Sequence, residues 1–354
     1  MTMLAPSAIR IADVQVGPGH PCFFIAEAGV NHNGDVELAL ELVEAAHRAG
    51  ADAVKFQTFS ADRLALRQAP KSDYQKRSTP ADETQHAMLR RLELSPEAHE
   101  TLFRRCNQLG LTFLSTPFDE PAADQLERLG VAAFKIPSGE ITNLPYLAHV
   151  AKKGRPMIVS TGMATLAEVE AAVETIEATG NRDFILLHCV SNYPAEPSDV
   201  NLRAMRTLAT AFGVPIGYSD HTLGVEVALA AVAMGACVIE KHFTLDRRMP
   251  GPDHAASLEP EELATLVRGI RVIEAAMGDG RKTPAERERE TALVARKSLV
   301  AACDIPAGAI VTEAHIALMR PGTGLPPAMR TYFLDRRAKS HIPAGTLLNF
   351  DMVG

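Results

Sequence analysis

The sequence has no tryptophan, fewer basic than acidic residues and no long apolar run. No segment approaches the roughly 20 apolar residues of a membrane-spanning helix, so we expect no transmembrane segment. The first ten residues lack a long apolar core and a basic region before it, so we expect no secretory signal peptide. The net charge of -7 argues against nucleic acid and against an anionic membrane surface as partners. It does not exclude an anionic small molecule, whose binding depends on a local cluster of lysines and hydroxyl groups.

Cysteine is also scarce. The cysteines are scattered, odd in number and without a CxxC pair: Cys22, Cys106, Cys189, Cys237 and Cys303. This pattern does not fit the disulfide framework of a small secreted domain. We therefore predict reduced core cysteines in a cytoplasmic protein.

What the sequence has instead is a regular alternation of short apolar runs and helix-length amphipathic segments. Eight apolar runs occur, at residues 23–28, 52–57, 111–116, 133–137, 157–161, 184–189, 214–218 and 237–240. An amphipathic segment follows each run, and the last of these segments lies at 261–277. Such alternation demands a parallel sheet, and eight units fit a closed TIM (β/α)8 barrel. A doubly wound open sheet is the alternative, but no glycine-rich dinucleotide-binding motif follows the first run.

Two segments depart from this alternation within the predicted barrel. Residues 9–16 alternate apolar and polar side chains and predict a hairpin that caps the bottom of the barrel. Residues 60–93 are polar and rich in charge. We interpret them as a long loop with some helix over the mouth of the site.

The composition changes again after the barrel. We predict a catalytic barrel domain over residues 1–280, a charged linker over 281–297 and a small β-rich domain over 298–354. The small domain is rich in proline, glycine and short alternating runs. Residues 305–312 and 342–349 are similar in sequence, and this internal repeat predicts a compact pseudo-symmetric module of short strands and turns.

Two histidines stand at the ends of the last two apolar runs. His221 follows the run at 214–218, and His242 follows the run at 237–240. Neighbouring parallel strands lie about 4.8 Å apart, so two imidazoles at the same end can reach one ion. The alternative is a pair of hydrogen-bonded polar residues at the barrel rim. This stretch alone leaves both interpretations open.

Active sites of such barrels lie at the C-terminal ends of the strands, where further polar residues gather. Two lysines with several hydroxyl groups make a cradle for a phosphate or carboxylate. The segment at 135–140 is the densest, with a cation, a hydroxyl and a carboxylate in one loop, although a rim salt bridge is the alternative for any single lysine. The candidates are Glu27, Lys55, Gln57, Ser115, Thr116, Lys135, Ser138, Glu140, Ser160, Thr161, His188, Ser191, Asn192, Tyr193, Ser219, Asp220, His221, Lys241 and His242.

A series of short motifs runs along the chain in a characteristic order. They are Ala26-Glu-Ala-Gly-Val-Asn-His-Asn-Gly34, Val54-Lys-Phe-Gln-Thr58, Phe134-Lys-Ile-Pro-Ser-Gly-Glu140, Ser160-Thr-Gly-Met163, Leu187-His-Cys189 with Tyr193-Pro194, Tyr218-Ser-Asp-His221, Glu240-Lys-His242 and Gly251-Pro-Asp-His254. By these motifs the chain resembles the sialic acid synthase family of nonulosonate synthases, in which a barrel precedes an antifreeze-like (SAF) domain. The resemblance covers nearly the full length.

The resemblance implies a reaction that joins phosphoenolpyruvate to the open-chain aldehyde of an N-acylated mannosamine-type sugar. C3 of the enol attacks the aldehyde, water adds at C2, and phosphate leaves by carbon–oxygen cleavage. It implies that His221 and His242 bind a divalent ion, manganese or magnesium, which polarises the aldehyde. It also implies Glu140 as the residue that transfers a proton.

The same resemblance assigns the remaining site residues. Those around phosphoenolpyruvate are Lys55, Thr116, Lys135, Ser138, Ser160, Ser191 and Ser219. Those near the sugar or the metal are Glu27, Gln57, Tyr193 and Asp253, and Asn192 completes the predicted substrate-binding set.

The small domain and the acceptor follow from the resemblance as well. Arg320 matches an arginine that reaches the active site of the partner subunit and touches the sugar's acyl group, which implies a homodimer with a swapped C-terminal domain. Some members of the family carry asparagine at the position of Ser191, which is a departure. The segments at 136–145 and 69–75 are similar to those of legionaminic acid synthases. The resemblance therefore implies N-acetylmannosamine or a 6-deoxy diacetamido sugar (2,4-diacetamido-2,4,6-trideoxymannose) as the acceptor, and these two segments favour the latter. The product is correspondingly N-acetylneuraminate or N,N'-diacetyllegionaminate.

Two other functions stay open at this point. A Schiff-base aldolase on the same barrel would use Lys135 or Lys241 as the nucleophile, and borohydride trapping with substrate distinguishes it. A carbohydrate- or ice-binding protein is suggested only by the terminal module. Release of phosphate from phosphoenolpyruvate in the presence of sugar would exclude a protein that only binds carbohydrate or ice.

Overall fold

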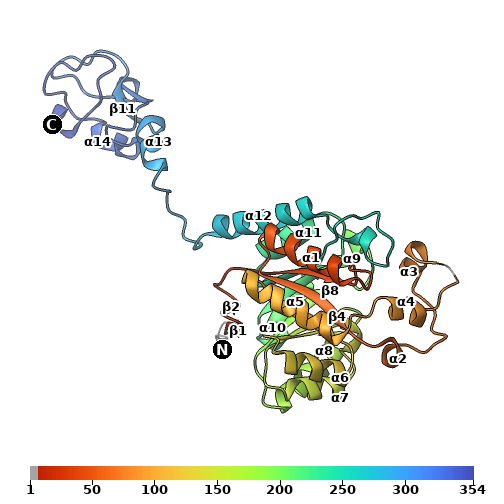
Figure 1. The fold of residues 1–354 in the computed structure, drawn as a ribbon. Coiled ribbons are helices and arrows are strands. Elements are labelled where there is room, and N and C mark those ends of the chain that lie inside the picture. The colour runs from red at the N-terminus through yellow and green to blue at the C-terminus, as the bar shows by residue number, and fades with distance from the viewer. Residues whose placement is uncertain (1–6, 81) are drawn as a thin grey trace. The chain divides into compact units, whose positions relative to one another are not determined.

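The computed structural model describes residues 7–80 and 82–354. The chain divides into two compact units, Met1–Gly278 and Asp279–Gly354 (Figure 1). Residues 1–6 belong to the stretch for which no signal peptide is predicted, and they lie outside the described ranges. Within those ranges, no helix combines the length and apolar character that crossing a membrane requires.

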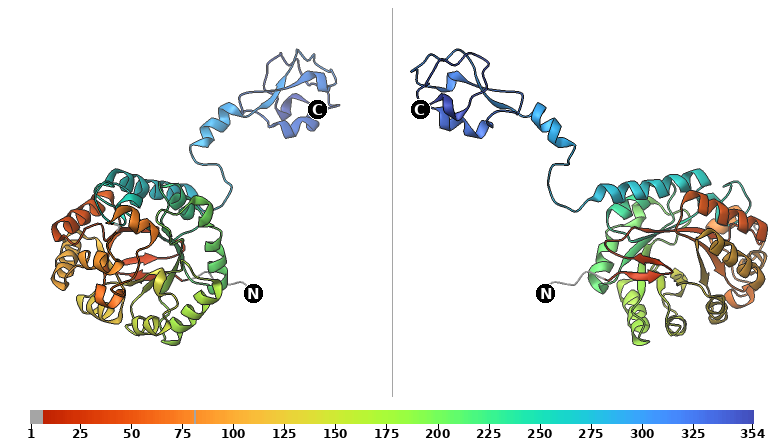
Figure 2. Two further views of the ribbon diagram at one scale, coloured as in Figure 1. Left: turned by 90° about the vertical axis from the view of Figure 1, so that its right-hand side faces the viewer. Right: turned by 60° about the vertical axis from the view of Figure 1, so that its left-hand side comes forward.

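The first unit is a ring of parallel strands surrounded by helices, seen end-on in Figure 2. Its strands are β3 (Phe23–Gly29), β4 (Ala53–Thr58), β5 (Thr112–Pro117), β6 (Phe134–Ile136), β7 (Met157–Ser160), β8 (Phe184–Cys189), β9 (Ile216–Asp220) and β10 (Val238–His242). Its longer helices are α1 (Val36–Ala49), α5 (Pro96–Leu109), α6 (Glu120–Leu129), α7 (Leu144–Ala151), α8 (Leu166–Ala178), α10 (Ala204–Phe212), α11 (Glu226–Ala233) and α12 (Pro260–Met277). Short turns of helix lie at α9 (Pro197–Val200), η1 (Ser138–Glu140) and η2 (His254–Ala256).

The order of the strands decides between the barrel and the open sheet. The eight-stranded sheet runs β5-β4-β3-β10-β9-β8-β7-β6, so the first barrel strand pairs with the last. Val238 of β10 lies opposite Phe23 of β3 in this parallel pairing. The two ends of the ladder, β5 and β6, are themselves in contact. The predicted (β/α)8 barrel is confirmed, and the doubly wound sheet is excluded.

Helix boundaries follow local sequence signals. The Asp35 carboxylate accepts a hydrogen bond from the Glu37 backbone N–H at 2.8 Å and caps α1. Gly50, with φ of 80°, ends that helix in the left-handed conformation that glycine adopts without strain. Ser95 caps α5, and Pro96 takes its first position, where the missing N–H of proline costs no helix hydrogen bond.

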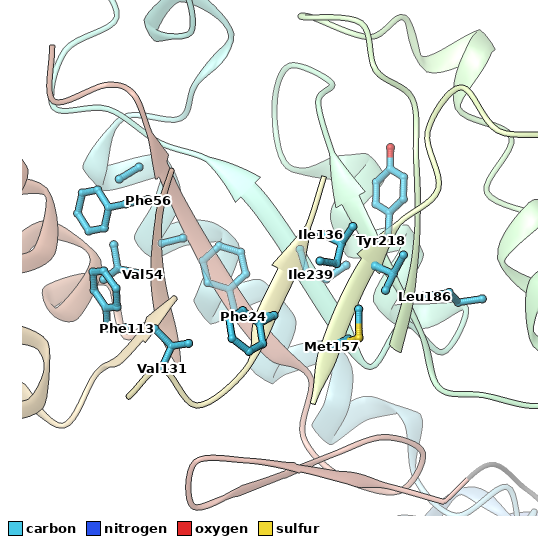
Figure 3. Close-up of a cluster of buried hydrophobic side chains, with 14 of the residues drawn as sticks. Phe24, Val54, Phe56, Phe113, Val131, Ile136, Met157, Leu186, Tyr218 and Ile239 are labelled. Carbon is cyan, nitrogen blue, oxygen red and sulfur yellow. The ribbon is translucent and has the colours of Figure 1, made fainter. Parts of the chain in front are cut away.

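Two apolar layers stabilise the barrel. Between strands and helices lies a large cluster that includes Phe24 and Val54 (Figure 3). Inside the ring, Phe23 at the start of β3 packs with the buried residues of the hairpin β1 (Ile9–Ile11) and β2 (Val14–Val16). The hairpin therefore closes the end of the barrel opposite the C-terminal ends of the strands, as predicted.

The segment at 60–93 combines loop with three short helices, α2 (Ala61–Leu64), α3 (Asp73–Ser78) and α4 (Gln85–Arg91). Helices α2 and α4 pack against each other. The carboxylate of Glu93 accepts a hydrogen bond from the Ala61 backbone N–H at 2.6 Å. Figure 1 shows the three helices together beside the barrel. The prediction of a long loop with some helix is met.

The first helix described in the second unit lies within the segment 281–297, for which the sequence predicts a linker. Helix α13 (Glu288–Ala295) has no buried residue, which fits the charged composition that suggested a linker. Beyond it lie strands β11 (Ser298–Ala301) and β12 (Ile316–Met319), helix α14 (Arg330–Phe333) and the turns η3 (Glu313–His315), η4 (Pro327–Met329) and η5 (Phe350–Met352).

The two copies of the internal repeat, residues 305–312 and 342–349, pair with each other in this unit. Ile305 and Ile342, the first residues of the two copies, exchange both backbone hydrogen bonds at 2.9 Å each. Both side chains are buried in the unit's apolar core. The two copies therefore meet at equivalent positions, as a pseudo-symmetric module requires.

Candidate active site

A cavity of about 520 Å³ opens at the C-terminal ends of the barrel strands. This is the end at which barrel enzymes carry their active sites. The structure brings together in its lining thirteen residues that the sequence predicts: Glu27, Lys55, Gln57, Thr116, Lys135, Ser138, Ser160, Ser191, Tyr193, Ser219, His221, His242 and Asp253. Because the strands are parallel, residues far apart in the chain meet at this one rim.

Two buried lysines and two buried carboxylates lie at the centre of the cavity. Lys55 Nζ is 2.8 Å from Glu27 Oε2 and 3.6 Å from Glu240 Oε2. Lys135 Nζ is 3.5 Å from Glu240 Oε1. Each of the four side chains is at most 6% exposed. Glu240 of β10 thus bridges two ammonium groups that come from β4 and β6, the strands on either side of β5.

The surroundings of Glu27 and Glu240 shift the pKa values of these two carboxyl groups in opposite directions. Burial raises the pKa of Glu27 to about 7, although Lys55 acts in the opposite direction. Burial alone would also raise the pKa of Glu240, but Lys135 and Lys55 outweigh it and lower this pKa to about 2. Burial lowers the pKa of Lys135, and the negative charge of Glu240 opposes that effect. Glu240 is therefore a permanent anion between the lysines.

Hydroxyl and backbone groups form a cradle beside Lys135. Lys135 Nζ donates to Ser160 Oγ at 2.7 Å, and the Gly162 backbone N–H donates to Ser138 Oγ at 3.0 Å. A Cβ at Gly162 would lie 2.3 Å from Ser191 Oγ and 2.8 Å from Ser138 Oγ. A side chain at Gly162 would therefore fill the cradle. An ammonium, an N–H and several hydroxyls converging on one space suit a phosphate.

The two predicted metal ligands lie side by side. The ring centroids of His221 and His242 are 5.6 Å apart. His221 Nδ1 lies 2.6 Å from the Val190 carbonyl oxygen, so this nitrogen carries the proton and Nε2 keeps a lone pair. His242 Nδ1 is buried and has no hydrogen-bond partner among the described residues. Burial lowers the pKa of both rings, which keeps them neutral.

These two imidazoles fit a divalent ion. Neutral imidazole nitrogens bind manganese and similar ions, and an orphaned buried nitrogen is a donor that an ion can use. Among the described residues, no group of three His, Cys, Asp or Glu side chains is arranged to hold a metal. Water or substrate would therefore complete the coordination. Asp253 also lines the cavity, and burial raises its pKa to about 6.

Lys241, one of the two lysines considered as an aldolase nucleophile, has a different setting. Its Nζ donates to Asp220 Oδ2 at 2.6 Å and to the Thr222 carbonyl oxygen at 2.7 Å. The side chain is 1% exposed and is absent from the described lining of the cavity. This buried ion pair links β9 to β10 directly before His221 and His242, so Lys241 supports the rim instead of facing substrate.

Of the residues to which the resemblance assigns a role, three do not belong to the described lining of the cavity. Five further strand-end candidates are also absent from that lining: Ser115, Thr161, His188, Asp220 and Lys241. Glu140, at the end of η1, is partly exposed, and its Oε2 accepts a hydrogen bond from Asn143 at 2.7 Å. Asn192 is exposed, although its neighbours on both sides line the cavity. Arg320 belongs to the second unit, is exposed, and donates from Nε to the Ala295 carbonyl oxygen at 3.0 Å.

Glu240 is the residue that sequence reasoning missed. It appears there only within the Glu240-Lys-His242 motif, while Glu140 receives the proton-transfer role. A signal was present, because side chains two apart on a strand share a face and His242 already points to the site. Lys241, between them, belongs to the other face. The mouth segment at 60–93 also contributes lining side chains outside every motif, among them Leu64 and Met88, whereas its segment at 69–75 was singled out by the resemblance.

Family models match nearly the whole chain. The NeuB family matches residues 42–282, and the SAF domain matches residues 296–354. The N,N'-diacetyllegionaminic acid synthase of Legionella pneumophila is 51% identical, over 95% of this chain and 96% of its own length. The enzyme of the same name from Campylobacter jejuni is 48% identical, over 92% of this chain and 98% of its own length.

Solved structures agree with these matches. The N-acetylneuraminic acid (sialic acid) synthetase of Leptospira borgpetersenii, crystallised with citrate, has a TM-score of 0.72 and 36% identity. The similarity covers 81% of this chain and 95% of that one. The relatives therefore share the fold and between 36% and 51% of the aligned sequence.

Proposed function

Because this chain belongs to the NeuB family, we propose that it is a nonulosonic acid synthase that condenses phosphoenolpyruvate with 2,4-diacetamido-2,4,6-trideoxymannose to give N,N'-diacetyllegionaminate and phosphate. The observation that carries the proposal is one cavity holding a lysine–serine cradle for an anion beside two neutral histidines. The choice of product rests on the high identity to two synthases of that name.

The cradle would hold the phosphate of phosphoenolpyruvate. Lys135 supplies the positive charge, and Ser138, Ser160 and the Gly162 backbone N–H supply directed donors. Lys55, 2.8 Å from Thr116 Oγ1, would face the carboxylate of the same molecule. Fixing both ends of phosphoenolpyruvate orients C3 toward the acceptor, and such orientation can supply several kcal/mol of the barrier.

A divalent ion, manganese or magnesium, would bind to His221 and His242. When bound it would supply Lewis acidity toward the acceptor's aldehyde oxygen. Tyr193 packs on the His221 ring, with ring centroids 4.2 Å apart, and limits the orientation of that ring. The direction in which His221 would hold the ion is thereby restricted.

Three proton changes balance the reaction. The water that adds at C2 loses both protons as its oxygen becomes the keto oxygen, the aldehyde oxygen gains one, and the departing phosphate gains the other. We assign proton handling to Glu27, whose Oε1 lies 3.5 Å from Gln57 Nε2 and which pairs in register with His242. Glu240 would keep Lys55 and Lys135 charged and fixed. Support for Glu27 over Glu140 is its place in the lining of the cavity, where Glu140 is absent.

The first test uses purified protein, phosphoenolpyruvate, manganese and a panel of acceptors. We expect phosphate release that depends on acceptor and is fastest with the 6-deoxy diacetamido sugar, slower with N-acetylmannosamine and its 6-phosphate. Mass spectrometry of the product identifies the acid. Fastest turnover of N-acetylmannosamine would assign N-acetylneuraminate instead, and no release with any acceptor would refute the synthase.

A second candidate function, a Schiff-base aldolase, is favoured by one observation, the lowered pKa of the buried Lys135. A lysine of this kind can act as a neutral amine nucleophile. Its contact with Glu240 and its hydrogen bond to Ser160 favour the charged form instead. Borohydride added during turnover separates the two functions, because only an imine leaves a reduced adduct on Lys135.

We also propose that the enzyme is a homodimer in which Arg320 of one subunit contacts the acceptor's acyl group in the other. The exposed guanidinium of Arg320 supports this, because part of it is available to another molecule. Glu240→Gln protein mixed with Arg320→Ala protein should regain activity on subunit exchange, since one site then has both residues. No recovery, with heterodimers shown by mass spectrometry, would place Arg320 outside a shared site.

A cytoplasmic location belongs to the same proposal. All five cysteines are free thiols, and four of them are buried, but Cys303 is exposed, so the prediction of a core position is wrong for that residue. Structural disulfides are common in secreted proteins and rare in reducing compartments. Free thiols throughout the chain support a reducing compartment.

A further inference from the structure

One wall of the cavity is apolar, and the mechanism above does not use it. Leu64 of α2, Met88 and Leu89 of α4, and Leu92 after α4 line the cavity together with side chains of the rim. The rim contributes Val30 and Phe118, each just beyond the end of a strand. The same six residues, with Phe59, form a separate apolar cluster.

The wall has a defined place beside the polar centre. Val30 follows β3, the strand that carries Glu27, and Phe118 lies two residues after Thr116 of β5. The apolar wall therefore lies beside the ends of β3, β4 and β5. There it adjoins Glu27 and Gln57, which the resemblance places near the acceptor. It also adjoins Lys55 and Thr116, which would face the carboxylate of phosphoenolpyruvate. The phosphate cradle comes from β6, β7 and the residues after them, on other strands of the ring.

Polar contacts on the outside hold this wall in place. Asp62 of α2 pairs with Arg90 of α4 at 3.1 Å and with His86 at 2.9 Å. Glu93 accepts the Ala61 N–H at the start of α2. Phe118 packs edge-on against Phe59, with ring centroids 5.9 Å apart. The apolar side chains are thus presented by helices that are tied together, so the wall has a fixed shape.

We propose that Leu64, Met88 and Leu89 form an apolar subsite that selects acceptors by their methyl groups. The ligands are the acetamido methyls and the methyl carbon of a 6-deoxy sugar. The inference rests on the proposed synthase function and adds the residues that choose the acceptor. Burying a methyl group against leucine and methionine is favourable, whereas a 6-hydroxyl or 6-phosphate would lose its hydration there without gaining a partner.

Leu64 and Leu89 are the residues to change, because both are only partly buried and a polar side chain there should not unfold the barrel. The variants are Leu64→Gln and Leu89→Gln, with Leu89→Met as the conservative rescue. Leu66→Gln is the matched control, since Leu66 lies in the same segment, is 83% exposed and does not line the cavity as described. Each is assayed with the 6-deoxy diacetamido sugar and with N-acetylmannosamine.

For both cavity variants we expect kcat/KM for the diacetamido sugar to fall at least roughly tenfold, the scale of one misplaced methyl group in an apolar pocket. The fall for N-acetylmannosamine should be smaller, so the preference between the sugars narrows. The KM for phosphoenolpyruvate should stay within about twofold, and Leu89→Met should restore the preference.

Other outcomes overturn the inference. An equal fall for both acceptors, or no greater change than in Leu66→Gln, means that the wall only packs the mouth segment. A raised KM for phosphoenolpyruvate of the same size means general damage to the site. Wild-type protein that uses neither acceptor refutes the proposed function itself, and the subsite with it.

Discussion

Glu240→Gln should lower kcat by roughly 10²–10³-fold, the cost of removing one preorganised charged contact from a buried active site. The carboxylate lies 3.5 Å from Lys135 and 3.6 Å from Lys55, and it accepts a hydrogen bond from Ser219 at 2.9 Å. Glutamine keeps the shape and removes the charge. Lys55 keeps its ion pair with Glu27, but Lys135 loses the carboxylate that offsets its repulsion from Lys55, and the position of Lys135 changes.

Binding of phosphoenolpyruvate should respond in the opposite way. The ligand is an anion, and Glu240 is an anion inside its site, so removing that charge should leave affinity unchanged or increase it. Calorimetry measures this affinity, a phosphate-release assay measures kcat, and circular dichroism checks the fold. Glu170→Gln, on the exposed surface of α8, is the control that changes the same functional group outside the site.

Glu140→Gln, prepared alongside, compares the two carboxylates directly. If Glu140→Gln loses turnover while Glu240→Gln stays within about tenfold of the wild type, the role assigned to Glu240 is wrong. The motif-based assignment of proton transfer to Glu140 would then stand, and the hydrogen bond between Glu140 and Asn143 would have to open during the reaction.

His242→Ala should abolish most activity and weaken manganese binding, while the protein stays folded. The residue ends β10, whose backbone ladder with β3 does not depend on the side chain. Loss of a ligand leaves the ion with one imidazole, because the described residues offer no arranged group of three. Chelator-treated wild type should be inactive and regain activity with manganese or magnesium.

Calorimetric titration with manganese provides a readout that does not require turnover. We expect weaker binding to His221→Ala and His242→Ala than to the wild type. His149→Ala, which removes a partly exposed imidazole on α7, should bind manganese as the wild type does. Full activity in chelator, or unchanged manganese affinity in both site variants, would refute the role of these histidines.

The sequence by itself determined the barrel and the rim. Apolar runs and amphipathic helices are local patterns, and eight of them in alternation leave few ways to bury every apolar face. Parallel strands bring their C-terminal ends to one side, so a list of polar residues after the runs already contained most of the polar side chains that the barrel rim contributes to the cavity. The histidine pair, both lysines and the serines followed from that rule without knowledge of any contact.

The tertiary structure alone decided which way individual side chains face. Glu240 and His242 share the inner face of β10, while Lys241 between them pairs with Asp220. Glu140, in a turn after its strand, bonds to Asn143 instead of lining the cavity. Alternation along a strand relates Glu240 to His242, but which face of β10 lines the cavity, and where the turn after β6 directs Glu140, depend on register and on long-range neighbours.

The mouth segment at 60–93 shows most clearly which features of the site a local sequence pattern does not predict. Its polar composition indicated a covering loop, but the apolar residues Leu64, Met88 and Leu89 are too few and too irregularly spaced to mark a site in sequence. They become a wall only because α2 and α4 pack together over the rim. Local periodicity therefore determined the scaffold, and packing between distant segments decided the shape and the charge of the site.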